Sequence, residues 1–186
     1  MKTRMLALTL VAVVLITGFG VGQGVLKSGP QAGDRVPGPF HPLNVTGPNA
    51  GEKFCLYCEN GPAPVAMVFA REVSPGLIKL IKLIDAATVK NDKASMGSFV
   101  VFLGGGEELE GKLKSLANKE NIKKTVLSID SPQGPGRYNL SKDADVTVVL
   151  YNEFVVVSNH SYRKGELNDG TIGRIVADIP KILPKN

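Results

Sequence analysis

The motif Cys55-Leu56-Tyr57-Cys58 contains the only two cysteines of the chain and is its best candidate for chemistry. Two thiols at this spacing can form a disulfide with each other and exchange it with another thiol. The same pair could instead be a structural disulfide or half of a metal site. All three interpretations are open, and the choice depends on where the pair lies relative to the first helix of the fold.

A metal site would need more ligands than the two thiols. The chain has two histidines, His41 and His160, which with Cys55 and Cys58 would make a Cys₂His₂ set suited to zinc or copper. No second C-x-x-C exists, which excludes a zinc ribbon, and Glu59 stands where haem attachment requires histidine. We therefore predict no metal ligand and no cofactor, and we expect both histidines to be surface residues beside turns.

The sequence around the cysteines favours a weakly activated pair. A helix N-terminus or a nearby positive charge lowers a thiol pKa and makes the thiol reactive. Gly61 and Pro62 follow the pair too closely for a helix to begin at Cys58. Glu59 opposes ionisation of the thiols, and Lys53 favours it. A disulfide across so short a ring contributes roughly 2 kcal/mol of stability in the chain-entropy relation.

The start of the chain has the pattern of an export signal. Lys2 and Arg4 precede an uncharged apolar run at residues 5–21, and a glycine-rich stretch follows. This order is typical of a secretory signal peptide, and the run is short for a membrane-spanning helix, which needs about 20 residues. We predict a signal peptide at residues 1–24, with an uncleaved N-terminal anchor as the alternative. The protein is then exported, to the periplasm or outside the cell, where disulfides persist.

The charge pattern argues against nucleic acid as a partner. The formal net charge is +5, but the lysines of residues 112–124 alternate with glutamates of residues 107–120. Such alternation is typical of a solvated helix face and not of a basic stripe. We expect no nucleic-acid partner and membrane contact only through an uncleaved N-terminal segment. A protein thiol or disulfide is the expected partner if the cysteines are redox-active.

Apolar runs and helical periodicity alternate after a Gly/Pro-rich stretch. Residues 25–39 predict a linker, which leaves one domain at residues 40–186. The run at residues 64–70 is apolar throughout and predicts a central strand covered on both faces. Ser74 as N-cap and Pro75 at the first position predict the start of a helix that Asn91-Asp92 ends.

The remaining elements complete an α/β pattern. They are a short strand at 40–45, a strand at 98–103, a helix at 107–118, a strand at 124–129, a short helix within 137–144, a hairpin of strands 146–151 and 153–158, and a helix at 170–183. The adjacent β-rich runs divide at Asn152-Glu153, which indicates antiparallel pairing. The sequence therefore predicts an α/β sheet with an antiparallel end.

Several motifs add a family resemblance. Gly33-Asp34-Arg35-Val36-Pro37, with Phe40 and Leu43-Asn44-Val45-Thr46-Gly47 after it, resembles the opening motif of redoxins. Residues 65–70 with the following turn at 71–76 resemble the strand and active-site turn of a thioredoxin. The chain thus resembles the thioredoxin-like superfamily, nearest its redoxin and peroxiredoxin branch, over residues 33–183. This resemblance implies a three-layer α/β/α sandwich with a mixed sheet.

The departures from the family concern its active site. Val73 and Gly76 stand where the family turn has cysteines, and only Pro75 of that turn is kept. The peroxiredoxin Thr-x-x-Cys is missing from the same place. Val146 stands before Thr147 where the family has a cis-proline. The C-x-x-C of this chain lies upstream of the central strand instead of after it.

We predict an exported thioredoxin-like protein in which Cys55 and Cys58 form a redox-active or redox-sensing disulfide. It would be a thiol–disulfide oxidoreductase in the enzymatic case, with Cys55 as the attacking thiol by analogy with the family order. The alternatives are a non-catalytic binding module with a structural disulfide and a Cys/His metal-binding protein.

Overall fold

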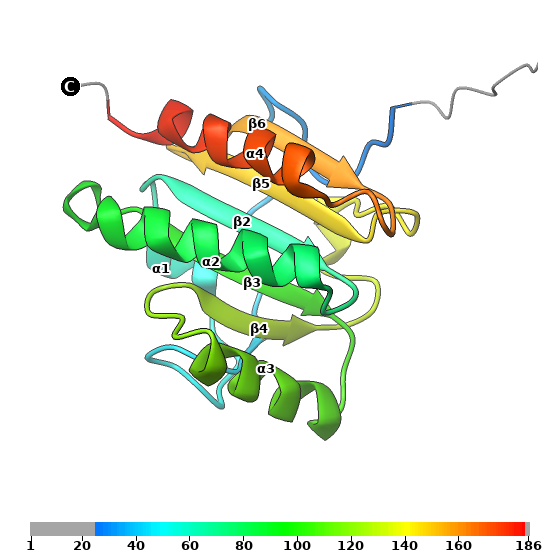
Figure 1. Ribbon diagram of the computed structural model, residues 1–186. Coiled ribbons are helices and arrows are strands. Elements are labelled where there is room, and N and C mark those ends of the chain that lie inside the picture. The colour runs from blue at the N-terminus through cyan, green and yellow to red at the C-terminus, as the bar shows by residue number, and fades with distance from the viewer. Residues whose placement is uncertain (1–24, 185–186) are drawn as a thin grey trace, which may run out of the picture.

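A computed structural model describes residues 25–184, which build layers of helices and irregular chain around one sheet (Figure 1). The predicted signal peptide lies outside the described residues. Within residues 25–184, no helix is long and apolar enough to cross a membrane.

The sheet is mixed, as predicted. Its strands are β1 (Leu43–Asn44), β2 (Val65–Ala70), β3 (Gly97–Leu103), β4 (Val126–Asp130), β5 (Val146–Asn152) and β6 (Val155–Tyr162), in the order β1-β4-β3-β2-β5-β6. Strands β2, β3 and β4 are parallel, and β1, β5 and β6 are antiparallel to their neighbours. Every residue of β2 is buried, because helices cover one of its faces and the N-terminal part of the domain covers the other.

Four α-helices accompany the sheet within residues 25–184. They are α1 (Leu56–Asn60), α2 (Pro75–Lys90), α3 (Glu107–Lys119) and α4 (Asp169–Asp178), with 3-10 turns η1 (Asp92–Ala94), η2 (Gly136–Tyr138) and η3 (Ile179–Ile182). The predicted cap of α2 is confirmed, since Ser74 Oγ accepts a hydrogen bond from the Leu77 N–H at 3.2 Å. The predicted last helix ends earlier than expected, because Pro180 has no N–H to continue it and η3 follows.

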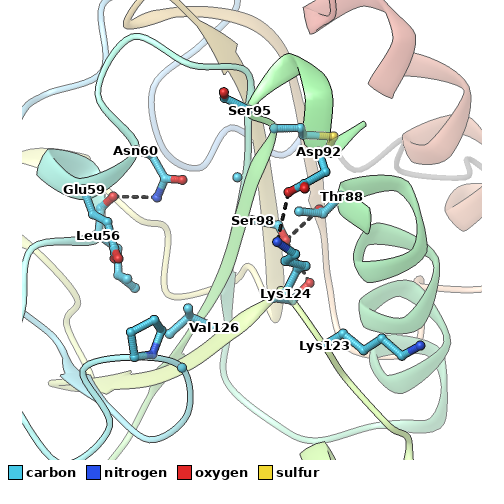
Figure 2. Close-up of a pocket in the computed structure, with 15 residues that line it drawn as sticks. Leu56, Glu59, Asn60, Thr88, Asp92, Ser95, Ser98, Lys123, Lys124 and Val126 are labelled. Atoms are coloured by element: carbon cyan, nitrogen blue, oxygen red, sulfur yellow. Dashed lines mark hydrogen bonds and ion pairs between the residues drawn. The ribbon is translucent and has the colours of Figure 1, made fainter. Parts of the chain in front are cut away.

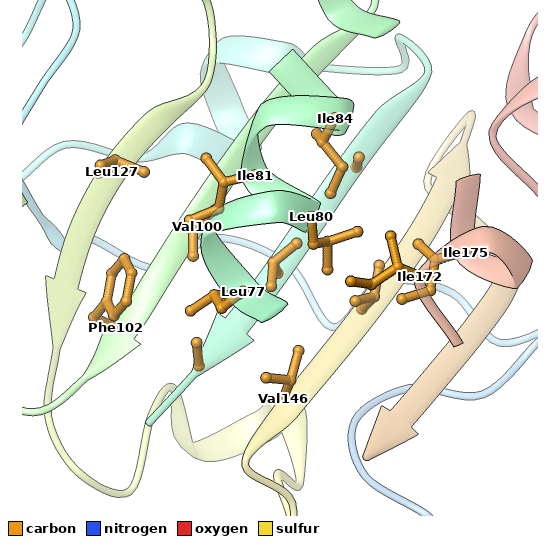
Figure 3. Packing of buried hydrophobic residues seen from close by; sticks show 14 of the residues in the cluster. Leu77, Leu80, Ile81, Ile84, Val100, Phe102, Leu127, Val146, Ile172 and Ile175 are labelled. Carbon is orange, nitrogen blue, oxygen red and sulfur yellow. The ribbon is translucent and has the colours of Figure 1, made fainter. Parts of the chain in front are cut away.

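Two apolar clusters lie on opposite faces of the sheet. On one face the buried side of α2 meets the sheet and α4, as Figure 3 shows for Leu80, Val100 and Ile172. On the other face Val36, Phe40 and Leu56 cover β2, β3 and β5. Leu56 belongs to α1 and is only 1% exposed, so the cysteine motif is anchored in this second cluster.

The segment that the composition predicts as a linker packs along the hairpin of β5 and β6. Ser28 Oγ lies 2.7 Å from Thr147 Oγ1, and Arg35 pairs with Val155 of β6 in an isolated bridge. The Val36 N–H donates to the Phe154 carbonyl at 2.8 Å. These contacts satisfy part of the outer edge of β6, which would otherwise present unpaired backbone groups. Glycine and proline content alone does not show such edge pairing.

Candidate functional site

Cys55 and Cys58 form a disulfide within a single helical turn. Their Cα atoms are 5.2 Å apart. Cys55 is the N-cap of α1, and its Sγ accepts a hydrogen bond from the Cys58 N–H at 3.1 Å. Gly61 ends the helix after five residues with φ of 54°, a conformation that glycine adopts freely. The sequence prediction excluded a helix from Cys58 onward and missed this shorter helix, which begins before it.

The two cysteines differ in exposure. Cys55 is 5% exposed, whereas Cys58 is an exposed residue. An external thiolate can therefore approach Cys58 more readily than Cys55. The family order implies the opposite assignment, with the first cysteine as the accessible one. Leu56, which directly follows Cys55, is buried in the second apolar cluster. Cys55 is therefore also held inside the protein.

Side chains of α1 fix the motif against two distant parts of the chain. Asn60 Nδ2 donates to the Leu56 carbonyl at 2.7 Å, and the Asn60 amide lies directly over Gly97 at the start of β3. A Cβ at position 97 would collide with that amide. On the other side, the Tyr57 ring packs on Phe154 with centroids 5.2 Å apart. Gly97 and Phe154 thus determine where the disulfide lies.

The turn that carries Phe154 has an unusual backbone. Glu153 and Phe154 both have positive φ, 51° and 63°, between β5 and β6. Two positive-φ residues suit a tight hairpin turn, but this conformation costs of order 1–3 kcal/mol for a bulky side chain. A hydrogen bond from the Glu153 N–H to the Pro62 carbonyl at 2.9 Å holds the turn beside the cysteine segment. The sequence predicted the hairpin but not its contact with Tyr57.

The disulfide lies at the opposite end of the sheet from the family active site. Helix α1 precedes β2, so it lies where β2 begins, whereas the family turn follows Ala70 where β2 ends (Figure 1). The six residues of β2 span about 20 Å at the usual strand rise. The N-terminus of α2 therefore cannot activate Cys55 or Cys58.

The turn at the carboxyl end of β2 has no room for the second family cysteine. A Cβ on Gly76 would collide with the carbonyl oxygen of Leu167. Val146 begins β5 and pairs with Ala70, and no peptide bond among residues 25–184 is cis. The turn after β2 therefore differs from the family turn in its packing as well as in its sequence, because it lacks both the family cysteines and the cis-proline.

Arg71, at the start of this turn, holds the turn in place through hydrogen bonds. Its guanidinium donates to the carbonyls of Ala144 at 3.0 Å, Pro132 at 2.9 Å and Ser141 at 3.2 Å. These bonds join the end of β2 to the connection between β4 and β5. Nearby, burial raises the pKa of Asp145, and the charge of Glu72 adds to the effect.

The two histidines do not join the cysteines. His160 Nε2 lies 3.0 Å from both Asp178 Oδ2 and Ser158 Oγ, between β6 and α4. Burial acts to raise the pKa of Asp178, but hydrogen bonds from Lys181, Ser158 and His160 lower it to about 2. His160 is therefore a half-buried partner of Asp178 and not the surface residue that the sequence predicted.

His41 lies elsewhere, in a groove that Lys53 also lines, beside β1. In the part of the chain that the structure describes, no three His, Cys, Asp or Glu side chains are grouped to hold a metal ion. The Cys₂His₂ set that the sequence left open is not assembled.

The strand order and helix placement define a thioredoxin-like fold, and comparison with solved structures agrees. A Bacteroides thetaiotaomicron protein, provisionally assigned as a protein disulfide isomerase, has a TM-score of 0.64 at 16% identity over 86% of this chain and 96% of its own. A secreted Mycobacterium tuberculosis disulfide oxidoreductase homologous to DsbE has a TM-score of 0.57 at 12% identity over 76% and 95%.

Peroxidoxin BcpB from Mycobacterium tuberculosis has a TM-score of 0.57 at 13% identity, over 86% of this chain and 99% of its own. No protein-family profile and no curated protein matches the sequence. At these identities the likeness establishes the fold. The chain therefore combines a thioredoxin-like fold with a C-x-x-C disulfide upstream of the central strand.

Proposed function

We propose that the protein is an exported thiol–disulfide exchange protein whose redox-active or redox-sensing group is the Cys55–Cys58 disulfide. The unequal exposure of the two cysteines carries this proposal. A disulfide with one cysteine at the surface and the other held inside is more open to attack at the exposed cysteine. The thioredoxin-like neighbours, which include a disulfide oxidoreductase, support the same chemistry.

The second part of the proposal is that the protein is exported. It rests on the signal-peptide pattern of residues 1–24 and on the exported state of one structural neighbour, which is described as secreted. An oxidising compartment would keep the Cys55–Cys58 disulfide formed until a partner thiol reaches it. The intact mass of the exported protein tests this part, because a cleaved signal removes about 24 residues.

The order of attack follows from the geometry. A partner thiolate attacks the Cys58 sulfur, a partner–Cys58 disulfide forms, and the Cys55–Cys58 bond breaks with its electron pair on Cys55. The Cys58 N–H, 3.1 Å from Cys55 Sγ, stabilises the thiolate that leaves. A second partner thiolate then attacks the partner sulfur and expels Cys58. The partner dithiol is oxidised, and the two protein thiolates take protons from solvent.

In the reverse direction Cys58 attacks a partner disulfide and Cys55 resolves the mixed disulfide. This differs from the family analogy, which assigns the attack to Cys55. Single serine variants separate the two orders. Cys55→Ser leaves the exposed thiol and should react with a chromogenic aromatic disulfide at least about tenfold faster than Cys58→Ser, which leaves the buried one. Equal rates, or the opposite ranking, would overturn the assignment.

The turn at the carboxyl end of β2 favours a second candidate, a non-catalytic binding module with a structural disulfide. Position 76 cannot hold a side chain there, and the family cysteines are absent. The reduction potential decides between the two candidates. A value above about −300 mV, together with faster reduction of insulin by dithiothreitol when the protein is present, supports exchange, because structural disulfides lie below that value. A lower potential, together with no acceleration of insulin reduction by the protein, supports the binding module.

A further inference from the structure

The two flanks of α1 differ in what they face. One flank, formed by Leu56, Glu59 and Asn60, lines a groove of about 570 Å³ beside the amino ends of β3 and β4 (Figure 2). Cys55 and Cys58 do not line this groove. A partner sulfur that attacks the disulfide must therefore approach outside the groove, where the rest of α1 is at the surface.

Two aromatic rings lie next to the exposed cysteine on the other flank. Tyr57 directly precedes Cys58, and successive helix residues are roughly 100° apart around the axis, so the two side chains are neighbours. The Tyr57 ring packs on Phe154 with centroids 5.2 Å apart and planes tilted by 42°. Both residues are half-buried, so the pair is in part accessible to solvent. A polypeptide that brings a sulfur to Cys58 is therefore brought beside this aromatic pair.

The backbone of the β5–β6 turn is unfavourable for the residue that carries the second ring. Phe154 has φ of 63°, and Glu153 before it has φ of 51°. Asparagine and glycine are the usual residues of such a turn, because they adopt positive φ readily. The stabilisation from one aromatic pair is of the same order as the cost of this strain. Stability therefore gives little reason for phenylalanine at position 154, whereas strained residues cluster at binding sites.

Hydrogen bonds on both sides hold the turn in this position before a partner arrives. The Glu153 N–H donates to the Pro62 carbonyl at 2.9 Å, and the Val36 N–H donates to the Phe154 carbonyl at 2.8 Å. The rings are thus preorganised, which lowers the entropic cost of binding. Glu59 and Glu153 are exposed, so charged side chains border the cysteine and the rings. An apolar centre with a polar border is the usual anatomy of a protein interface.

We propose that Tyr57 and Phe154 form a docking surface for an apolar side chain next to the reactive cysteine of the partner polypeptide. The inference rests on the exchange function proposed above and adds the class of partner sequence. The bond between the two sulfurs in the mixed disulfide fixes the partner chain at Cys58, so the residue that flanks the partner cysteine lies within reach of the rings. Burial of an aliphatic side chain against the rings stabilises this complex, and a polar side chain gains nothing there.

Two blocked, uncharged peptides test the proposal, one with leucines on both sides of its cysteine and one with serines. The leucine peptide should reduce the wild-type disulfide about tenfold faster, with rates compared per thiolate. In Phe154→Gly the ratio of the two rates should fall below about twofold, because the ring is lost. Leu83→Ala removes an exposed apolar side chain of α2, on the other face of the sheet, and should keep the ratio. Equal rates in the wild type, or an unchanged ratio in Phe154→Gly, would overturn the proposal.

Urea denaturation of Phe154→Gly distinguishes a binding role of the ring from a structural one. Glycine adopts positive φ without strain, so the midpoint should lie close to that of the wild type. A large fall in the midpoint would assign the ring to stability of the fold and would contradict the binding role.

Three further outcomes separate the possible failures. If dithiothreitol reduces the disulfide and neither peptide does, the exchange function fails together with the docking surface, whereas equal peptide rates refute the docking surface alone. The leucine peptide with serine in place of cysteine tests binding without exchange, and it should shift the ring protons of Tyr57 and Phe154 in NMR spectra. Shifts confined to other residues would refute the site. A dimer that dissociates in Phe154→Gly would show that a second copy of the chain covers the rings, and would refute the partner polypeptide.

Discussion

At the carboxyl end of β2, Ser74 and Pro75 begin a helix of sixteen residues whose N-terminus could stabilise a thiolate, but no sulfur is there. At the amino end both sulfurs are present, one on the N-cap and one within a helix of five residues. The thioredoxin arrangement joins a long helix and a cysteine pair at one end of this strand. Here the two are separated by the length of the strand.

This separation shows that activation of a thiol by a helix depends on where the thiol lies relative to the N-terminus of that helix. A helix dipole acts within the first turn of its own helix, so α2 cannot influence the Cys55–Cys58 disulfide. Reactivity at the amino end must come from the exposure of Cys58 and from the N–H that Cys55 accepts. We therefore expect slower exchange than in a thioredoxin.

The largest effect that separates the two ends is expected for Gly76→Ala. The added Cβ would collide with the Leu167 carbonyl, a backbone atom that cannot rotate away, and should destabilise the fold by about 1–3 kcal/mol. Urea denaturation measures the change. Gly173→Ala in α4, where an added Cβ would meet no other part of the fold within 4 Å, is the matched control and should be neutral or stabilising. The rate of disulfide reduction by dithiothreitol should not change.

If Gly76→Ala were as stable as its control, the packed turn would not explain the missing family cysteine. If it altered the disulfide rate, the two ends of β2 would be coupled. Either result would contradict the difference proposed here between the two ends of β2.

A smaller effect is expected for Gly97→Ala at the amino end. The new Cβ would displace the Asn60 amide and break its hydrogen bond to the Leu56 carbonyl, at a cost of about 1 kcal/mol. Helix α1 should loosen, and dithiothreitol should reduce the disulfide several-fold faster. A double-mutant cycle with Asn60→Ala gives the control, since the alanine leaves nothing to displace. Additive effects of the two changes would contradict the proposed contact between Asn60 and position 97.

The smallest effect is expected at the carboxyl end, for Asp145→Asn. Burial raises the pKa of this carboxyl in the folded protein above its unfolded value near 3.9. Its contribution to stability is therefore greatest below pH 4 and is lost as the pH rises through the folded pKa. Asparagine should remove this loss and increase stability at pH 7 by less than about 1 kcal/mol.

Urea denaturation at several pH values between 3 and 7 measures this dependence. Asp143→Asn, at an exposed neighbouring position, controls for the removal of one negative charge. A pH dependence that survives in Asp145→Asn would assign it to other groups.

Local patterns in the sequence predicted most of the sheet and α2. The unbroken apolar run predicted the buried strand β2, and Ser74 and Asn91 predicted the ends of the helix, because these signals act within a few residues. The helix α1 was missed because five residues carry no periodicity. The contacts of Asn60 with Gly97 and of Tyr57 with Phe154 join distant segments, and no local signal encodes them.

The placement of Tyr57 has an optical consequence. The chain has no tryptophan, so its near-ultraviolet emission comes from four tyrosines. Tyr57 lies between the two cysteines and against the Phe154 ring, while Tyr138 and Tyr151 are buried in the second cluster. A disulfide quenches the emission of an adjacent tyrosine. Opening of the Cys55–Cys58 bond should therefore brighten one tyrosine, which gives the protein an internal reporter of its own redox state.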